Sequence, residues 1–231
     1  MFTPIDSQPE YRKREAVAAD GMITCLHPRA ADAAVTVLRN GGNAIDAAVT
    51  AGFVLGVVEP MMSGFGGGGI MVVRLASGQT VVIEHGPQAP ATATPEMFEL
   101  VGEGNAGFYG WPAVKDDANI YGPRSIAVPG TVAGLALALE RFGTLSLADA
   151  LAPAIRLADE GFPLDWFTAA AIAMDTKKLR CFPASAAILL SDGAPLPPHY
   201  DIYPSYLVQR DLAQTLRTLA RDGADAVYHG E

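Results

Sequence analysis

The stretch that most constrains this fold is "AIDAAVTAGFVLGVVEPMMSGFGGGG", residues 44–69. Its first part predicts a helix that is apolar nearly all round, and a helix of this kind has to be buried. Alanine and glycine recur along it, so neighbouring backbones can approach closely. Pro60 ends this helix, because proline is not tolerated in a helix interior. The sequence therefore predicts a tightly packed helix followed directly by a glycine-rich crossing.

The glycine-rich segment "SGFGGGG", Ser63 to Gly69, invites comparison with a phosphate-binding loop. Such a loop lies between a strand and a helix, whose N-terminal N–H groups bind the anion. Here a helix precedes the segment and a strand-like run follows it. Neither Lys nor Ser or Thr directly follows Gly69, as a phosphate-binding loop would require. We therefore predict that these glycines serve close backbone packing or support a nearby site.

Helix boundaries are signalled locally in several places. His27-Pro28 opens one helix, Gly41-Gly42 ends it, and Asn43 can cap the buried helix, with Asp46 in its first turn. Pro153 is predicted to kink or break a later helix. Further helices are expected over residues 130–142, from the cap Ser146 onward, over 166–174 and over 207–221.

Strand signals fall mostly in the first half of the chain. Short strands are predicted at 21–26 and 126–128, and a hairpin is predicted from 70–75 and 79–84. Residues 85–123 are rich in Pro, Gly and polar groups and predict a long surface loop. The expected class is α+β, with helices layered on a largely antiparallel sheet.

Composition limits the classes of function. The chain has 231 residues, half of them hydrophobic, and a net charge of −9, which fits a folded domain and argues against a nucleic-acid surface. We expect a tail at residues 1–14 and one domain over 15–231. The N-terminus lacks the apolar core of a secretory signal, which favours the cytoplasm, or the periplasm if a leader was removed. No membrane-spanning segment is predicted.

Residue chemistry alone indicates no reaction. The four histidines are scattered, so no metal site and no cofactor are predicted. Cys25 and Cys181 form no framework, and free buried thiols are favoured over a disulfide. Asp46 stands out in an apolar helix, and stabilisation of the first helical turn is its favoured role. These features support an α+β domain and nothing more specific.

Longer motifs are more informative. The run "GMITCLHPRAADAAVTVLRNGGNAIDAAVTAGFVLGVVEPMMSGFGGGGIMVV" is followed by "ATPEMF", "GPRSIAVPGTVAGLALALERFGTLSLADALAPAIRLADEGF" and "YPSYLVQRDLAQTLRTLARDGADAVYHGE". In this order they resemble the large subunit of the γ-glutamyltranspeptidase family. The resemblance covers residues 15–231 and is highly specific, because several long motifs are collinear.

The resemblance implies a fold and a reaction. The fold would be the four-layer αββα sandwich of N-terminal-nucleophile hydrolases, with only the large-subunit part in this chain. Family members are precursors that cleave themselves, and the new N-terminal Thr of the small subunit attacks an amide carbonyl. No Thr in this chain matches that nucleophile, so the resemblance places it beyond Glu231 and makes the small subunit the expected partner.

The resemblance also identifies a departure in the substrate site. γ-Glutamyl-specific members carry an Arg just before "E.AP", which binds the α-carboxylate of the glutamyl group. The corresponding segment here reads "EHGPQAP", and the Arg position falls on Gly86. His85 and Gln88 are the neighbouring groups that can offer hydrogen bonds. The expected substrate is therefore a small acyl amide, as in the cephalosporin-acylase and oxamate-hydrolysing branches, with His85, Gly86 and Gln88 as substrate-binding residues.

Two alternatives stay open at this stage. One is a true γ-glutamyl hydrolase or transferase that uses another cation, for which Arg124 is the candidate. The other is a non-catalytic scaffold or binding chain that kept the fold without the nucleophile.

Overall fold

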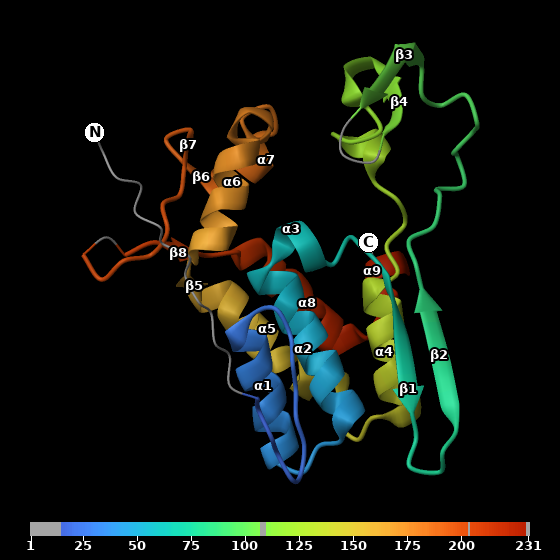
Figure 1. Cartoon of the computed structure of the whole chain (residues 1–231), viewed down its shortest axis with the longest axis vertical. Coiled ribbons are helices and arrows are strands. Elements are labelled where there is room, and N and C mark those ends of the chain that lie inside the picture. The colour runs from blue at the N-terminus through green and yellow to red at the C-terminus, as the bar shows by residue number, and fades with distance from the viewer. Residues whose placement is uncertain (1–14, 107–109, 203, 230–231) are drawn as a thin grey trace, which may run out of the picture.

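A helix buried along most of its length, α2, forms the centre of the computed structural model, which describes residues 15–106, 110–202 and 204–229 (Figure 1). The described elements are α1 (Pro28–Arg39), α2 (Ala44–Val58), α3 (Pro60–Ser63), β1 (Gly69–Arg74), β2 (Thr80–His85), β3 (Leu100–Ala106), β4 (Trp111–Val114), the 3-10 turns η1 (Lys115–Asp117) and η2 (Pro123–Ser125), α4 (Thr131–Phe142), α5 (Leu147–Glu160), β5 (Phe162–Pro163), α6 (Trp166–Leu179), α7 (Pro183–Leu189), β6 (Leu190–Ser191), β7 (Ala194–Pro195), β8 (Tyr206–Leu207), α8 (Arg210–Asp222) and α9 (Asp225–His229).

The small residues of α2 are explained by its neighbours. α2 lies between α1 and α4, and α5 packs against it (Figure 1). A Cβ atom on Gly52 would lie 3.1 Å from Leu135 of α4, and one on Gly56 would lie 2.8 Å from the ring of Phe65. That ring stacks on Phe53 of α2 at a centroid distance of 6.2 Å. The glycine-rich segment is thus anchored on α2 by its one aromatic residue.

The carboxylate of Asp46 joins three helix ends. It accepts the backbone N–H of Asn43 at 2.8 Å, which closes a capping box at the start of α2. It also accepts the N–H and hydroxyl of Thr144, both at 2.7 Å, and the N–H of Leu145 at 3.0 Å. Thr144 and Leu145 lie between the end of α4 and the start of α5. Asp46 therefore does more than stabilise its own first turn.

The turn between α4 and α5 packs closely against the Asp46 carboxylate. The side-chain amide of Asn43 donates to the carbonyl of Phe142 at 2.7 Å, which adds a second tie to the end of α4. A Cβ on Gly143 would lie 2.7 Å from Asp46 Oδ1. The turn between α4 and α5 can close on Asp46 only with glycine at this position.

Strands β1 and β2 form the predicted antiparallel hairpin, beside α4 (Figure 1). Val73 and Ile83 are buried on the face that belongs to the core. On the opposite face Ile70, Val72 and Val82 are exposed by 68%, 66% and 59%. Every sheet in the described part of the chain has two strands, so the outer edges of this hairpin are unpaired. Its outer face is apolar and exposed.

Three predictions about strands and loops are wrong. Residues 21–26 form no strand among the described residues, because no other segment pairs with them. Residues 85–123 are not one long loop, since β3 and β4 pair within them. Residue 128 forms only an isolated bridge, with Gln88, in place of the predicted strand at 126–128.

Two smaller expectations also need correction. α5 runs through Pro153 without a break, because Leu151, Ala154 and Ala158 are fully buried while α5 packs against α2 and α8. Both cysteines are free as predicted, but neither is fully buried: Cys25 is partly buried and Cys181 is exposed. Within the described ranges, no helix combines the length and the apolarity needed to span a membrane.

The Asp46 network predicts a pH-dependent loss of stability. Burial acts to raise the pKa of Asp46, but hydrogen bonds from Thr144, Leu145 and Asn43 outweigh it and hold that pKa below its ordinary value. A depressed carboxyl pKa stabilises the fold above the unfolded-state pKa of about 3.9. This contribution is lost as the pH falls through the folded-state pKa. Asp46→Asn should lower the free energy of unfolding at pH 7 by about 3 kcal/mol.

Urea unfolding at pH 7 and at pH 3 measures this effect. The gap between wild type and Asp46→Asn should narrow at the lower pH. Asp32→Asn, at an exposed position of α1, is the matched control and should change stability by less than about 0.5 kcal/mol. An Asp46→Asn protein as stable as the control at pH 7 would contradict the prediction.

Candidate functional site

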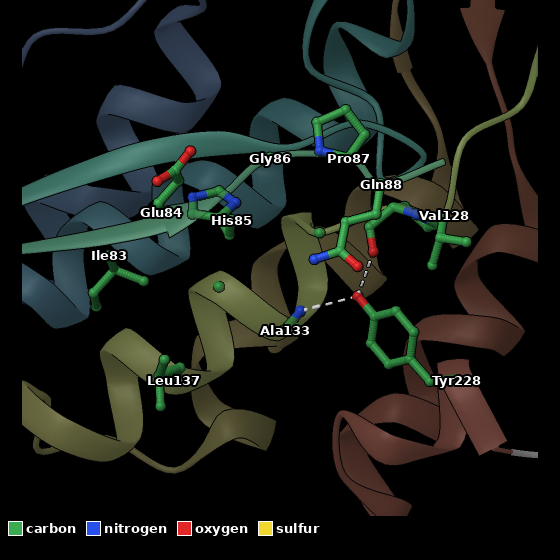
Figure 2. A pocket seen from close by; sticks show the side chains of 13 residues that line it. Ile83, Glu84, His85, Gly86, Pro87, Gln88, Val128, Ala133, Leu137 and Tyr228 are labelled. Atoms are coloured by element: carbon green, nitrogen blue, oxygen red, sulfur yellow. Dashed lines mark hydrogen bonds between the residues drawn. The ribbon is translucent and has the colours of Figure 1, made fainter. Parts of the chain in front are cut away.

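A pocket of about 630 Å³ opens where β2 ends (Figure 2). One wall is the end of β2 and the residues that follow it, from Ile83 to Gln88. The opposite side is formed by residues 128–130, the first turns of α4 and Tyr228 of α9. Segments far apart in the sequence therefore meet at this pocket.

All three substrate-binding residues expected from the sequence line this pocket: His85, Gly86 and Gln88. Gln88 is held by two backbone hydrogen bonds with Val128, of 3.0 and 2.8 Å. A Cβ added to Gly86 would meet nothing within 4 Å, so this position faces open space. The geometry brings the three positions together, and their role in binding stays a prediction.

Glycines surround His85 on several sides. A Cβ on Gly68 would overlap the His85 carbonyl and lie 2.7 Å from Pro87, and one on Gly69 would lie 3.1 Å from the imidazole. From α4, a Cβ on Gly134 would overlap the imidazole itself. His85 Nδ1 is buried and has no hydrogen-bond partner among the described residues. The end of β2 can reach its position only because these neighbours lack side chains.

The glycine-rich segment also contacts the start of α4. The N-cap of α4 is Gly130, which has no capping side chain. The carbonyl of Gly67 accepts the N–H groups of Gly130 and Thr131 at 2.9 and 3.2 Å. A helix N-terminus needs acceptors for its free N–H groups, and here the loop backbone provides one. The prediction that these glycines serve close packing is confirmed.

Tyr228 is a pocket residue that the sequence analysis missed. Its hydroxyl donates to the carbonyl of Pro129 at 2.8 Å and accepts the N–H of Ala133 at 3.3 Å (Figure 2). Tyr228 lies in the short helix α9, whose sequence has no periodicity that would assign it to a site. Only the contact across 95 residues reveals its place.

Arg124 lies in a different part of the fold. It belongs to η2, and its guanidinium carbon lies 5.3 Å from the ring centroid of Phe98. It lines a separate hollow of about 290 Å³ beside β4. The residues that line the His85 pocket include neither Arg nor Lys. The structure therefore does not bring Arg124 to the pocket of His85, Gly86 and Gln88.

A second group of titratable side chains is buried away from this pocket. Burial raises the pKa of Glu59, and the charge of Asp165 raises it further. Burial lowers the pKa of His27, although Asp165 opposes this shift from 3.7 Å. His27 and Asp165 are helix N-caps, of α1 and α6, which explains their positions. Throughout the described ranges, no group of three His, Cys, Asp or Glu could hold a metal ion.

Comparison with known proteins identifies relatives over almost the whole chain. A family model described as gamma-glutamyltranspeptidase matches residues 30–231. The chain is 42% identical over 219 residues to the Acylase ACY 1 proenzyme of Pseudomonas sp. (strain SE83), which covers 95% of this chain and 38% of that protein. It is 40% identical over 229 residues to the Glutathione hydrolase proenzyme of Bacillus subtilis (strain 168), which covers 99% of this chain and 36% of that protein. The chain thus spans less than two fifths of the length of these relatives.

Solved structures agree with the sequence relatives. Helicobacter pylori gamma-glutamyltranspeptidase matches with a TM-score of 0.83 and 31% identity, over 94% of this chain and 59% of that chain. Cephalosporin acylase from Bacillus halodurans matches with a TM-score of 0.79 and 26% identity, over 100% of this chain and 41% of that chain. The expected α+β class and N-terminal-nucleophile hydrolase fold are confirmed.

The glycines around His85 lead to a test within one short segment. Gly68→Ala should lower the free energy of unfolding by about 2 kcal/mol, because the new Cβ overlaps the end of β2. Gly66→Ala is the matched control, since a Cβ there meets nothing within 4 Å, and it should change stability by less than about 0.5 kcal/mol. Thermal or urea unfolding of both variants measures the difference. Equal stability of the two variants would show that the close approach at Gly68 is not required.

Proposed function

Because this chain belongs to the γ-glutamyltranspeptidase family, we propose that it forms the large-subunit portion of a self-processing amidohydrolase that acts on a small acyl amide. The observation that carries the proposal is the pocket that unites His85, Gly86 and Gln88 in a chain with this family's motifs. The relatives named as an acylase and a glutathione hydrolase are both proenzymes, which supports a second, catalytic subunit as the partner.

In the proposed reaction, the nucleophile is the N-terminal Thr of that second subunit. Its hydroxyl attacks the amide carbonyl with its own α-amine nearby as the base, and backbone N–H groups stabilise the oxyanion. The C–N bond then breaks, the amine leaves with the proton taken up by the α-amine, and an ester between the acyl group and Thr remains. Water hydrolyses this ester, which releases the carboxylic acid and restores the Thr hydroxyl. The residues of this chain bind the acyl group and fix its position, and they take no part in bond breaking.

The pocket favours a substrate that has no α-carboxylate, because its lining offers no Arg or Lys to bind one. Gly86 leaves open the space in which a family Arg side chain would lie. The polar side chains that line the pocket and can take part in recognition are those of His85, Gln88, Glu84 and Tyr228, and none of them is a fixed guanidinium or ammonium cation. A buried polar atom such as His85 Nδ1 usually has a partner, and a polar group on the acyl chain would supply one.

The rival γ-glutamyl specificity would need another cation. Arg124 is the candidate that the sequence offers, but its guanidinium lies over Phe98 and lines another hollow. This arrangement favours the small acyl amide.

An assay of the precursor, expressed together with any coding sequence that follows Glu231, tests the proposal. Oxamate, glutaryl amides and γ-glutamyl-p-nitroanilide should be compared side by side. We expect kcat/KM for at least one of the first two to exceed that for the γ-glutamyl substrate by tenfold or more. Fast turnover of γ-glutamyl-p-nitroanilide alone would refute the proposed specificity for a small acyl amide. A second subunit that does not begin with Thr would refute the proposed amidohydrolase activity.

The missing cation can be restored as a second test. Gly86→Arg should raise kcat/KM for γ-glutamyl-p-nitroanilide by roughly tenfold or more, because a guanidinium can pair with the α-carboxylate. Thr92→Arg adds the same charge at an exposed loop position outside the pocket lining and should have no such effect. An equal response of the two variants would remove the assignment of Gly86 as the specificity position.

A further inference from the structure

The first turn of α4 is fastened by groups from distant segments. Its N-cap, Gly130, offers no side chain, so the free N–H groups of the helix need other acceptors. The carbonyl of Gly67 accepts two of them, and the hydroxyl of Tyr228 accepts the N–H of Ala133 at 3.3 Å. The same hydroxyl donates to the carbonyl of Pro129 at 2.8 Å. Tyr228 thus binds both ends of the turn Pro129–Ala133 (Figure 2).

This turn also determines where the pocket wall lies. A Cβ on Gly130 would overlap the carbonyl of His85 and lie 3.0 Å from the carbonyl of Gly86. The preceding residue, Val128, makes two backbone hydrogen bonds with Gln88. A displacement of the turn would therefore move the backbone at all three proposed substrate-binding positions.

Tyr228 reaches this turn because the chain reverses direction after α8. Gly223 ends α8 with a φ of 87°, a left-handed value that favours glycine, and α9 begins two residues later. Its half-buried ring lines the pocket, and its hydroxyl uses both its donor and its acceptor capacity on the α4 turn. Phenylalanine would keep the ring and remove both hydrogen bonds.

We propose that Tyr228 is a positioning residue for acyl-group binding: its hydroxyl holds the α4 turn, and through it His85, Gly86 and Gln88, in the geometry that the reaction needs. This inference rests on the proposed function for the identity of the reaction. It adds a residue from the far end of the chain that acts through the backbone of the pocket wall. Small displacements of a positioned substrate lower rates strongly, so the effect should fall on the reaction and not only on stability.

Kinetics of Tyr228→Phe in the complete precursor test the proposal. With the amide that wild type turns over best, we expect kcat/KM to fall roughly tenfold, mainly through kcat, with a change of only a few degrees in melting temperature. Tyr121→Phe is the matched control, because it removes a hydroxyl in the 115–125 region, outside the pocket lining, and should leave kcat/KM unchanged. A lower melting temperature with unchanged kcat/KM would reduce Tyr228 to a structural role and overturn the proposal.

Hydrogen exchange supplies a readout that does not depend on the substrate. In Tyr228→Phe, the amide of Ala133 should exchange about tenfold faster, whereas that of Leu139 in the same helix should not change. Unaltered exchange at Ala133 would overturn the positioning role even in an active enzyme. A wild type that hydrolyses none of the tested amides would count against the proposed function, and exchange at Ala133 would still decide whether Tyr228 holds the turn.

Discussion

The buried carboxylate of Asp46 is the interaction on which the rest of the structure depends. One side chain closes the start of α2 and fixes the turn between α4 and α5 through three hydrogen bonds. α4, whose first turns form part of the pocket wall, packs against α2 and is held near its other end by this carboxylate. Asp46 therefore fixes a helix of the pocket wall although it does not line the pocket itself.

The glycine-rich segment contributes a hydrogen-bond acceptor to a helix start, whereas a phosphate-binding loop contributes donors to an anion. In a phosphate loop, backbone N–H groups at a helix start surround an anion. Here the helix start belongs to α4, which comes much later in the chain, and the loop supplies the carbonyl of Gly67 as the acceptor. Glycine is needed because the loop also passes within contact of His85 and Pro87.

Local signals in the sequence predicted much of the fold, whereas long-range contacts could not be predicted from it. Asn43 and Ser146 cap helices as expected, and α1 begins at Pro28 as expected, because a helix start is decided by residues two or three positions away. The β3–β4 hairpin is local but was missed, because β3 contains two glycines and β4 a proline, residue types that are depleted in strands. The lack of a partner for residues 21–26 depends on distant parts of the chain. The family motifs led to His85, Gly86 and Gln88, which the fold places in one pocket, but no motif pointed to Tyr228, whose contact with Ala133 is visible only in the folded chain.

The freedom at Gly86 contrasts with the crowding of the residues around it. Gly68, Gly130 and Gly134 cannot gain even a methyl group without moving the end of β2 or the side chain of His85. Gly86 faces open space, so a side chain at this position meets no such obstacle. On the proposed role of Gly86, acyl recognition can change at this one position without disturbing the surrounding backbone. Overall similarity is then a weak guide to which acyl group a relative accepts, and the identity of a single residue is a better one.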